Sequence, residues 1–393
     1  MVSGSFRPFV AAMLYAESVD GIVFTKPSLN LTTIGGSKRN NVVLSSTTPG
    51  TQYVLDGFSV LLDEQDPDPT RRWKLVSFTN AGHGSKPPFH GVGPKVLLAV
   101  SSDGFTFTNW TATVHDGRWD TYPSSLYDKQ RKQYVIFDRL TPGPPTQLRT
   151  EAYLHSTSTD FLGSWSNTSW TGLNSSATRQ PDQVVVFEYE GIWLGFGQMM
   201  NLPLPAGEAT SVDLELAVAT ELQGKWHWVA PGKHLIPRGA NGSRDSCEIF
   251  AARQPFVKGD EIWIYYVGGD GPFHGYRTNQ LMLAKIQRDG FAGYRESSGA
   301  GAGGGAVVVT RNVTVTGAKL LISADARAGS VSVGVIGGGA VSMSSPIAGR
   351  QVVDEPVSFE GGADLRGLIG ASVRLNITVT GDAVAFAFAF SAA

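Results

Sequence analysis

The sequence predicts an all-β protein, in which a five-bladed β-propeller with an incomplete first blade is followed by a C-terminal β-sandwich. Three observations support this prediction. Glycine accounts for 47 of the 393 residues, and only 17% of the residues are charged, a composition typical of many short strands joined by tight turns. A strand–turn–strand pattern recurs five times along the first 295 residues. A low-complexity linker then precedes a second series of alternating strands.

The recurring pattern consists of an apolar strand, a polar or glycine-containing turn and a short aromatic strand. Its five copies span residues 13–24, 97–107, 153–165, 214–228 and 281–294. Their spacing is close to that of four-stranded propeller blades with their loops, about 50 to 70 residues each. Five copies therefore predict five blades over residues 1–296.

Four of the five copies follow a further pair of strands, which would complete a four-stranded blade. The pairs are 58–62 with 73–78, 124–127 with 134–138, 184–189 with 192–197, and 249–257 with 262–269. A polar or glycine-containing turn divides the strands of each pair. Only residues 1–12 precede the first copy, so we expect the first blade to lack half of its strands and the chain to be truncated.

Residues 297–306 form a linker of glycine, alanine and serine. Alternating apolar and polar residues then mark six strands, at 307–315, 319–326, 331–336, 353–359, 373–380 and 384–390. We predict that these strands form an antiparallel sandwich over residues 307–393. Helical signals are almost absent, apart from a turn near residues 363–370.

The charge and apolar patterns exclude two classes of partner. The net charge is -2, so there is no basic surplus to bind a nucleic acid. No run of about 20 apolar residues occurs, so the sequence predicts no membrane-spanning helix. We also expect no metal site and no cofactor.

Asparagine motifs predict an extracellular protein. Seven of the twelve asparagines stand in Asn-x-Ser/Thr, where chance would give roughly two. They are Asn30, Asn109, Asn167, Asn174, Asn241, Asn312 and Asn376. Cys247 is the only cysteine, which excludes an internal disulfide. We expect a secreted glycoprotein whose signal peptide is absent from this chain, because Met1–Arg7 contains no hydrophobic segment.

Segments spread over nearly the whole chain resemble a known group of proteins. Residues 15–31, 36–44, 115–139, 213–275, 288–299 and 363–388 are similar to uncharacterised secreted proteins related to the five-bladed propellers of glycoside hydrolase families 32 and 43. The resemblance implies the propeller fold, and it implies action on a furanoside or related sugar of an extracellular polysaccharide or oligosaccharide. It specifies the fold more than the chemistry, because the chain has no WMNDPNG-like, Arg-Asp-Pro or Glu-Cys motif.

Propeller glycosidases hold their acids where the innermost strands begin, and four predicted blades have an acid at that position. These residues are Asp56, Asp120, Asp182, Asp245 and Glu248. Glycoside cleavage needs one carboxyl group that protonates the leaving oxygen and another that activates water or attacks carbon, and a third can stabilise charge. We predict Asp120 and Asp182 as base or nucleophile and stabiliser. Glu248 is the predicted general acid, because the apolar residues that follow it can raise its pKa.

Arginine accompanies these acids. Arg118, Arg179 and Arg244 each lie within three residues of one of them, where a guanidinium can keep a carboxylate ionised or bind an acidic sugar. Trp119 offers an aromatic face to a sugar ring. The predicted substrate-binding set is Asp56, Arg118, Trp119, Arg179, Arg244, Asp245, Arg253 and His274. For any single acid, the alternative is a carboxylate that caps a turn or a strand.

Three functions are consistent with these residues. The acids at four strand starts favour a glycoside hydrolase, and the expected partner is a carbohydrate. The incomplete first blade favours a propeller that binds carbohydrate without cleaving it. Arg179, Arg253 and His274 are compatible with a polysaccharide lyase, in which arginine would neutralise a uronate.

Overall fold

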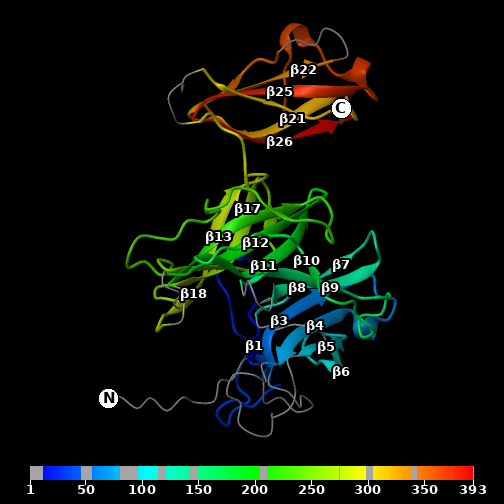
Figure 1. Ribbon diagram of the computed structural model, residues 1–393, viewed down its shortest axis with the longest axis vertical. Coiled ribbons are helices and arrows are strands. Elements are labelled where there is room, and N and C mark those ends of the chain that lie inside the picture. Colours follow the sequence, from blue (N-terminus) through cyan, green and yellow to red (C-terminus); the bar gives the residue numbers. More distant parts are fainter. Residues whose placement is uncertain are drawn as a thin grey trace. The chain divides into compact units, whose positions relative to one another are not determined.

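The computed structural model describes residues 12–45, 55–79, 95–113, 121–140, 148–203, 210–273, 275–297, 304–337 and 343–392 (Figure 1). Helical structure in these ranges is limited to the 3-10 turns η1 (Pro69–Arg71), η2 (Glu360–Gly362) and η3 (Arg366–Leu368). The prediction of an all-β chain with a turn near residues 363–370 is confirmed. Over the same ranges, no helix has the length and apolar character needed to cross a membrane.

The chain divides into two compact units. The first comprises Met1–Gln254 and Val267–Leu281, and the second comprises Pro255–Tyr266 and Met282–Ala393. This division differs from the domain limits that the sequence predicts, 1–296 and 307–393. Those limits remain a prediction.

Small antiparallel sheets, in which consecutive strands are neighbours, build most of the first unit. One sheet contains β3 (Leu55–Leu62), β4 (Trp73–Thr79), β5 (Lys95–Ser101) and β6 (Thr108–Thr113). The next contains β7 (Ser124–Asp128), β8 (Gln133–Leu140), β9 (Thr150–His155) and β10 (Ser169–Trp170). The same order recurs in β11 (Arg179–Tyr189), β12 (Ile192–Asn201), β13 (Ser211–Ala219) and β14 (His227–Trp228).

The third sheet continues beyond β13 with β15 (Glu248–Ala251), where Glu248 pairs in parallel with Val212. From β15 the strand order runs to β17 (Glu261–Gly269), whose last residues belong to the first unit. Both β16 (Phe256–Lys258) and β18 (Asn279–Gln287) pair with β17. Three of the four predicted strand pairs are therefore present as strands, and in the fourth the predicted strand 249–257 is divided into β15 and β16.

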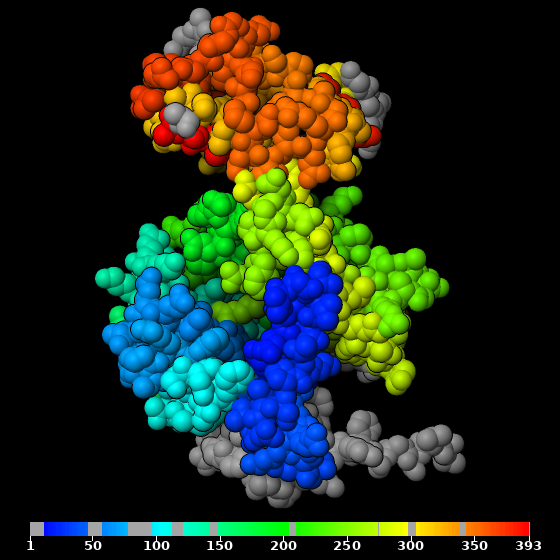
Figure 2. All heavy atoms as spheres, turned by 180° about the vertical axis from the view of Figure 1, so that it is seen from behind, coloured from blue at the N-terminus to red at the C-terminus, as the bar shows by residue number. Residues whose placement is uncertain are grey.

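A two-stranded sheet of β1 (Ala12–Leu14) and β2 (Val42–Ser45) opens the described chain. It packs through Leu44 against a core that includes Leu75 and Leu97 of the next sheet. Its segment, the dark blue surface in Figure 2, leaves Val19 and Val23 exposed, at 108% and 68%. This sheet is smaller than the four-stranded sheets that follow it, and the exposed residues belong to the connection between its strands, since β2 is buried along its whole length.

In two copies of the repeat, the turn is stabilised by the same hydrogen bonds from backbone N–H groups to Ser and Asp side chains. Oδ1 of Asp20 and Oδ1 of Asp103 each accept hydrogen bonds from the backbone N–H groups two and three residues later, at 2.7–2.9 Å. Ser18 and Ser101 each accept a hydrogen bond from the glycine N–H three residues later, at 2.9 and 3.0 Å. A common Ser-x-Asp-Gly sequence thus gives a common turn, because short polar side chains replace backbone partners there.

The first strands of successive sheets lie beside one another and are joined through serine hydroxyls. Ser125 N donates to Oγ of Ser59 at 3.1 Å, which links β7 to β3, and Val186 N donates to Oγ of Ser124 at 3.1 Å, which links β11 to β7. Arg253, which follows β15, donates to the carbonyl oxygen of Val60 in β3. The strands β3, β7 and β11 thus lie side by side, and the segment after β15 contacts β3. The number of blades remains a prediction.

Two antiparallel sheets form the C-terminal part of the second unit. One consists of β19 (Ala306–Val309), β25 (Ser372–Gly381), β22 (Gly329–Ile336) and β23 (Ile347–Ala348), with β20 (Val313–Thr314) beside β25. The other consists of β24 (Gln351–Pro356), β21 (Lys319–Asp325) and β26 (Val384–Ser391). Leu320, Val333 and Leu375 come from three of these strands and share one apolar core. Each of the six predicted segments contains a strand.

Gly57 lies where the backbone leaves no room for a side chain. Its φ is +59°, and a Cβ atom there would lie 2.2 Å from the carbonyl oxygen of Thr121. We expect Gly57→Ala to lower the free energy of unfolding by about 3 kcal/mol, since left-handed strain and overpacking add. Gly191, with φ +77° and nothing within 4 Å of a Cβ, is the matched control and should lose only about 1–2 kcal/mol as alanine. Equal losses in urea denaturation would contradict this account.

Candidate active site

A β-bulge positions Asp182. In the pairing of β11 with β12, Pro181 faces Met199 and Gln183 faces Gln198, so Asp182 is the extra residue between them. A bulge redirects the side chain of the residue that it inserts. The Asp182 side chain is buried, and Nη1 of Arg139 donates to its Oδ1 at 2.6 Å. Arg139, near the end of β8, therefore neutralises and orients this carboxylate.

Glu248 begins β15 and is completely buried. Nε of Arg277 lies 2.9 Å from Oε2 of Glu248, but neither carboxylate oxygen has a hydrogen-bond partner of good geometry within the described ranges. Burial raises the pKa of Glu248 to about 7; the Arg277 charge opposes this shift and the negative charge of Asp182 adds to it. Asp182 and Glu248 are thus close enough to interact, and Glu248 keeps a proton near neutral pH.

Gly269 and Arg277 define the immediate environment of the Glu248 carboxylate. Gly269, at the end of β17, makes room for the carboxylate, because a Cβ there would lie 2.6 Å from Oε2. The same glycine accepts a hydrogen bond from Cys247 N at 3.0 Å, which fixes the start of β15. Arg277 donates to the carbonyl oxygen of Phe273 and lies over the ring of that residue, 5.4 Å from its centroid.

Two further carboxylates complete a buried acid cluster, which comprises Asp138, Arg139, Glu151, Asp182, Glu248 and Arg277. Arg139 of β8 lies directly opposite Glu151 of β9 in the antiparallel strand pairing. Burial raises the pKa of Glu151 well above its ordinary range; Asp138 adds to this shift and Arg139 opposes it. Burial thus favours the protonated form of Glu151 over its carboxylate.

Sequence reasoning identified Asp182 and Glu248 but missed the rest of this cluster. The pair Asp138 and Arg139 directly follows the apolar run of β8, and that position at the end of a buried strand is a signal that could have revealed it. No comparable pattern marks Glu151 or Arg277.

Arg179 begins β11 but belongs to a second network. Its Nη1 donates to Oδ1 of Asn201 at 2.7 Å, its Nη2 donates to Glu215, and Asp213 lies 3.5 Å away. Burial alone would raise the pKa of Asp213, but hydrogen bonds from Asn201 and Arg238 lower it overall. These contacts tie β11, β12 and β13 together. The role of Arg179 in substrate binding remains a prediction.

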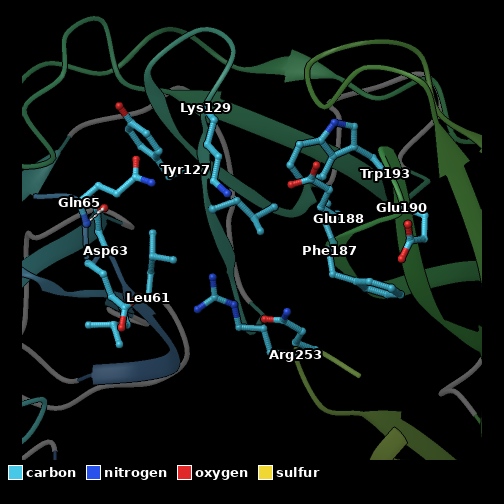
Figure 3. A pocket seen from close by; sticks show the side chains of 15 residues that line it. Leu61, Asp63, Gln65, Tyr127, Lys129, Phe187, Glu188, Glu190, Trp193 and Arg253 are labelled. Carbon is cyan, nitrogen blue, oxygen red and sulfur yellow. Dashed lines mark hydrogen bonds between the residues drawn. The ribbon is translucent and has the colours of Figure 1, made fainter. Parts of the chain in front are cut away.

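Arg253 follows β15 and is not among the residues around Asp182. It lines a cavity of about 620 Å³ formed where β3, β7 and β11 end. Figure 3 shows Arg253 and Lys129 extending toward this cavity from opposite sides, with Trp193 and Glu188 along another wall. The structure therefore does not bring Arg253 together with the buried acid cluster.

The other predicted binding residues are less informative. Arg244 is exposed, and Asp245 accepts a hydrogen bond from Oγ of Ser243 at 2.8 Å, in the loop before β15. Four predicted residues lie outside the described ranges, namely Arg118, Trp119, Asp120 and His274, and so does the side chain of Asp56. Within those ranges, no group of three or more His, Cys, Asp or Glu side chains is arranged to hold a metal ion.

The raised pKa of Glu248 predicts a pH-dependent stability. The folded chain keeps a proton that the unfolded chain loses, so stability is full below pH 4.5 and falls as pH rises toward about 7. The expected loss is about 3 kcal/mol. Glu248→Gln should remove this slope, and urea denaturation of both proteins at about pH 4 and about pH 8 measures it. Identical slopes in the two proteins would show that Glu248 does not keep its proton.

No protein-family model matches the chain, and no curated protein matches it in sequence. Among solved structures, it is similar to an N-acetylgalactosamine deacetylase from F. plautii in complex with blood group B trisaccharide, at 14% identity and a TM-score of 0.48 over 70% of this chain and 81% of that chain. The chain is also similar to a thermostable family-43 glycoside hydrolase, at 13% identity and a TM-score of 0.43. The similarity covers 63% of this chain and 77% of that chain.

A family-43 arabinoxylan arabinofuranohydrolase from Bacillus subtilis covers more of the chain, 86%, and is itself covered over 79%. Its identity is 11% and its TM-score 0.34. The similar structures thus include family-43 glycoside hydrolases. All three TM-scores lie below 0.5, so the function of this chain has to be inferred from its own residues.

Proposed function

We propose that the chain is a glycoside hydrolase that acts on a furanoside or related sugar of an extracellular polysaccharide or oligosaccharide. The observation that carries this proposal is the pair Asp182 and Glu248. Two carboxyl groups from different strands interact, and the pKa of one of them is raised to about 7. Glycoside cleavage needs one protonated and one ionised carboxyl group, and an environment that holds a proton on one partner assigns the roles.

In this assignment Glu248 is the general acid. It donates its proton to the glycosidic oxygen as the bond between that oxygen and the anomeric carbon breaks. Asp182, oriented by Arg139, attacks the anomeric carbon as nucleophile, takes a proton from the attacking water as base, or stabilises the positive charge that develops on that carbon. Asp120 takes the remaining role of this pair. Arg277, beside Oε2 of Glu248, stabilises the carboxylate that forms after proton transfer.

The fold that we propose for this activity is a five-bladed propeller with an incomplete first blade, followed by a β-sandwich. The contacts that join β7 to β3, β11 to β7 and Arg253 to β3 support the propeller. Two sheets with one shared core support the sandwich. We propose secretion on the basis of the excess of Asn-x-Ser/Thr motifs.

A second candidate is a propeller that binds carbohydrate without cleaving it. One observation favours it: Asp182 and Glu248 are both buried, and each has an arginine partner. A buried network of this kind also occurs where charges serve structure alone.

Sugar release separates the two candidates. The chain would be incubated with plant and algal polysaccharides and with aryl furanosides, beside the double variant Asp182→Asn/Glu248→Gln, and both would be tested on a glycan array. If the chain is a hydrolase, the wild type releases sugar and the double variant does not, although the variant still binds glycans. Glycan binding by both proteins without sugar release would replace the hydrolase with the binding propeller.

A further inference from the structure

Four Asn-x-Ser/Thr motifs follow the outer edges of the sheets. Asn109 stands in β6, the last strand of its sheet, and Asn167 lies just before β10, the last strand of the next. The carbonyl oxygen of Asn174 accepts a hydrogen bond from Nε1 of Trp228 at 3.1 Å, which places Asn174 beside the edge strand β14. Asn312 lies between β19 and β20, which border β25. The four motifs thus lie on or beside edge strands of different sheets.

These four asparagines are exposed. Asn109 also has a φ of +55°, in a strand whose pairing with β5 shifts register between Leu98 and Val100. Asparagine tolerates this left-handed conformation better than most residues. The local irregularity is compatible with a bulky group on the Asn109 side chain, since the regular ladder is already interrupted there.

Asn376 provides an internal contrast. It stands in the interior strand β25, between Val309 of β19 and Gly334 of β22. Its side chain is half-buried, and its Oδ1 is buried without a hydrogen-bond partner within the described ranges. The side chain of Asn376 is thus less accessible to a modifying enzyme than the exposed side chains of the four edge asparagines.

The position of the exposed motifs has a physical consequence. A strand at the edge of a sheet presents unpaired N–H and C=O groups, which can pair with another chain and start aggregation. An N-linked glycan is bulky and solubilising. A glycan on or beside an edge strand therefore prevents a second strand from approaching.

We propose that Asn109, Asn167, Asn174 and Asn312 carry N-linked oligosaccharides that cover the sheet edges, and that Asn376 stays unmodified. In this step the amide nitrogen forms a bond to C1 of the first sugar, supplied by a lipid-linked oligosaccharide diphosphate. The bond from C1 to the diphosphate oxygen breaks, the lipid diphosphate leaves, and the amide gives up one proton. This modification is independent of the proposed hydrolase activity.

Site mapping tests the modification. The full chain would be secreted from a eukaryotic cell line and treated with peptide N-glycosidase in ¹⁸O-labelled water, which converts each glycosylated asparagine into labelled aspartate. Peptide mass spectrometry should find the label at the four edge asparagines and not at Asn376. Asn109→Gln should remove one glycan mass from the intact protein, and Asn376→Gln should remove none. An unlabelled edge asparagine or a labelled Asn376 would overturn the proposal.

A matched pair of variants tests the covering of the edges. Asn30 and Asn241 are exposed in connections, between β1 and β2 and between β14 and β15, and not along edge strands. The variant with all four edge asparagines replaced by glutamine should aggregate several-fold faster in light scattering than the wild type. The double variant Asn30→Gln/Asn241→Gln should aggregate at the wild-type rate. Equal aggregation of the two variants would show that the glycans do not act at the edges.

Discussion

Replacing Glu248 with glutamine should lower kcat/KM for sugar release by about 10²- to 10⁴-fold, because an amide cannot donate the proton that the leaving oxygen needs. The loss should depend on the leaving group. A dinitrophenyl glycoside, whose leaving oxygen departs without protonation, should be cleaved by the variant at close to the wild-type rate. The measurement compares both substrates in both proteins.

Glu215→Gln is the matched control for this variant. Glu215 is also a buried glutamate, in β13, but it pairs with Arg179 in the second network. We expect it to lower stability and leave the ratio between the two substrates unchanged. A Glu248→Gln variant that loses the same factor on both substrates would contradict the assignment of Glu248 as general acid.

Asp182→Asn should lower kcat/KM by a comparable factor, about 10²- to 10⁴-fold, and here the loss should be the same for both leaving groups. A group that acts on the anomeric carbon contributes whether or not the leaving oxygen needs a proton. A substrate-dependent loss in this variant would exchange the roles of Asp182 and Glu248.

Stability has to be separated from activity in this variant, because Asp182 is the ion-pair partner of Arg139. Removing one member of a buried pair costs about 3–5 kcal/mol, since the other charge stays buried. The double variant Asp182→Asn/Arg139→Met removes both charges and should regain much of the stability without regaining activity. Activity that returns together with stability would show that Asp182 serves the fold alone.

The strands and turns could be predicted from the sequence because they depend on neighbouring residues. Glu190 and Gly191, with φ of +47° and +77°, form the tight turn between β11 and β12 at the polar dipeptide that separates the two apolar runs. Such a turn matches the twist of the strands that it joins. The six C-terminal segments were found in the same way, from the alternation of apolar and polar residues.

The buried acid cluster could be predicted only in part. Asp182 and Glu248 stand where strands begin, which sequence can indicate. Glu151 and Arg277 reach the same place from β9 and from the turn after β17, and their proximity depends on how the strands pack. Sequence proximity did not reveal the partners of Arg179, because Asn201 and Glu215 lie on the neighbouring strands β12 and β13. Arg253 lies only five residues after Glu248, but the extended strand β15 separates them, and Arg253 lines the cavity at the ends of β3, β7 and β11.

The pH dependence of kcat/KM tests the central claim most directly. Glu248 must be protonated to act as the acid, and its pKa is about 7. We predict a rate that falls as pH rises through about 7, and a fall that is absent when Glu248→Gln cleaves the dinitrophenyl glycoside. A rate that stays constant to about pH 9, or a fall near pH 7 that persists in the variant, would contradict the proposed role of Glu248.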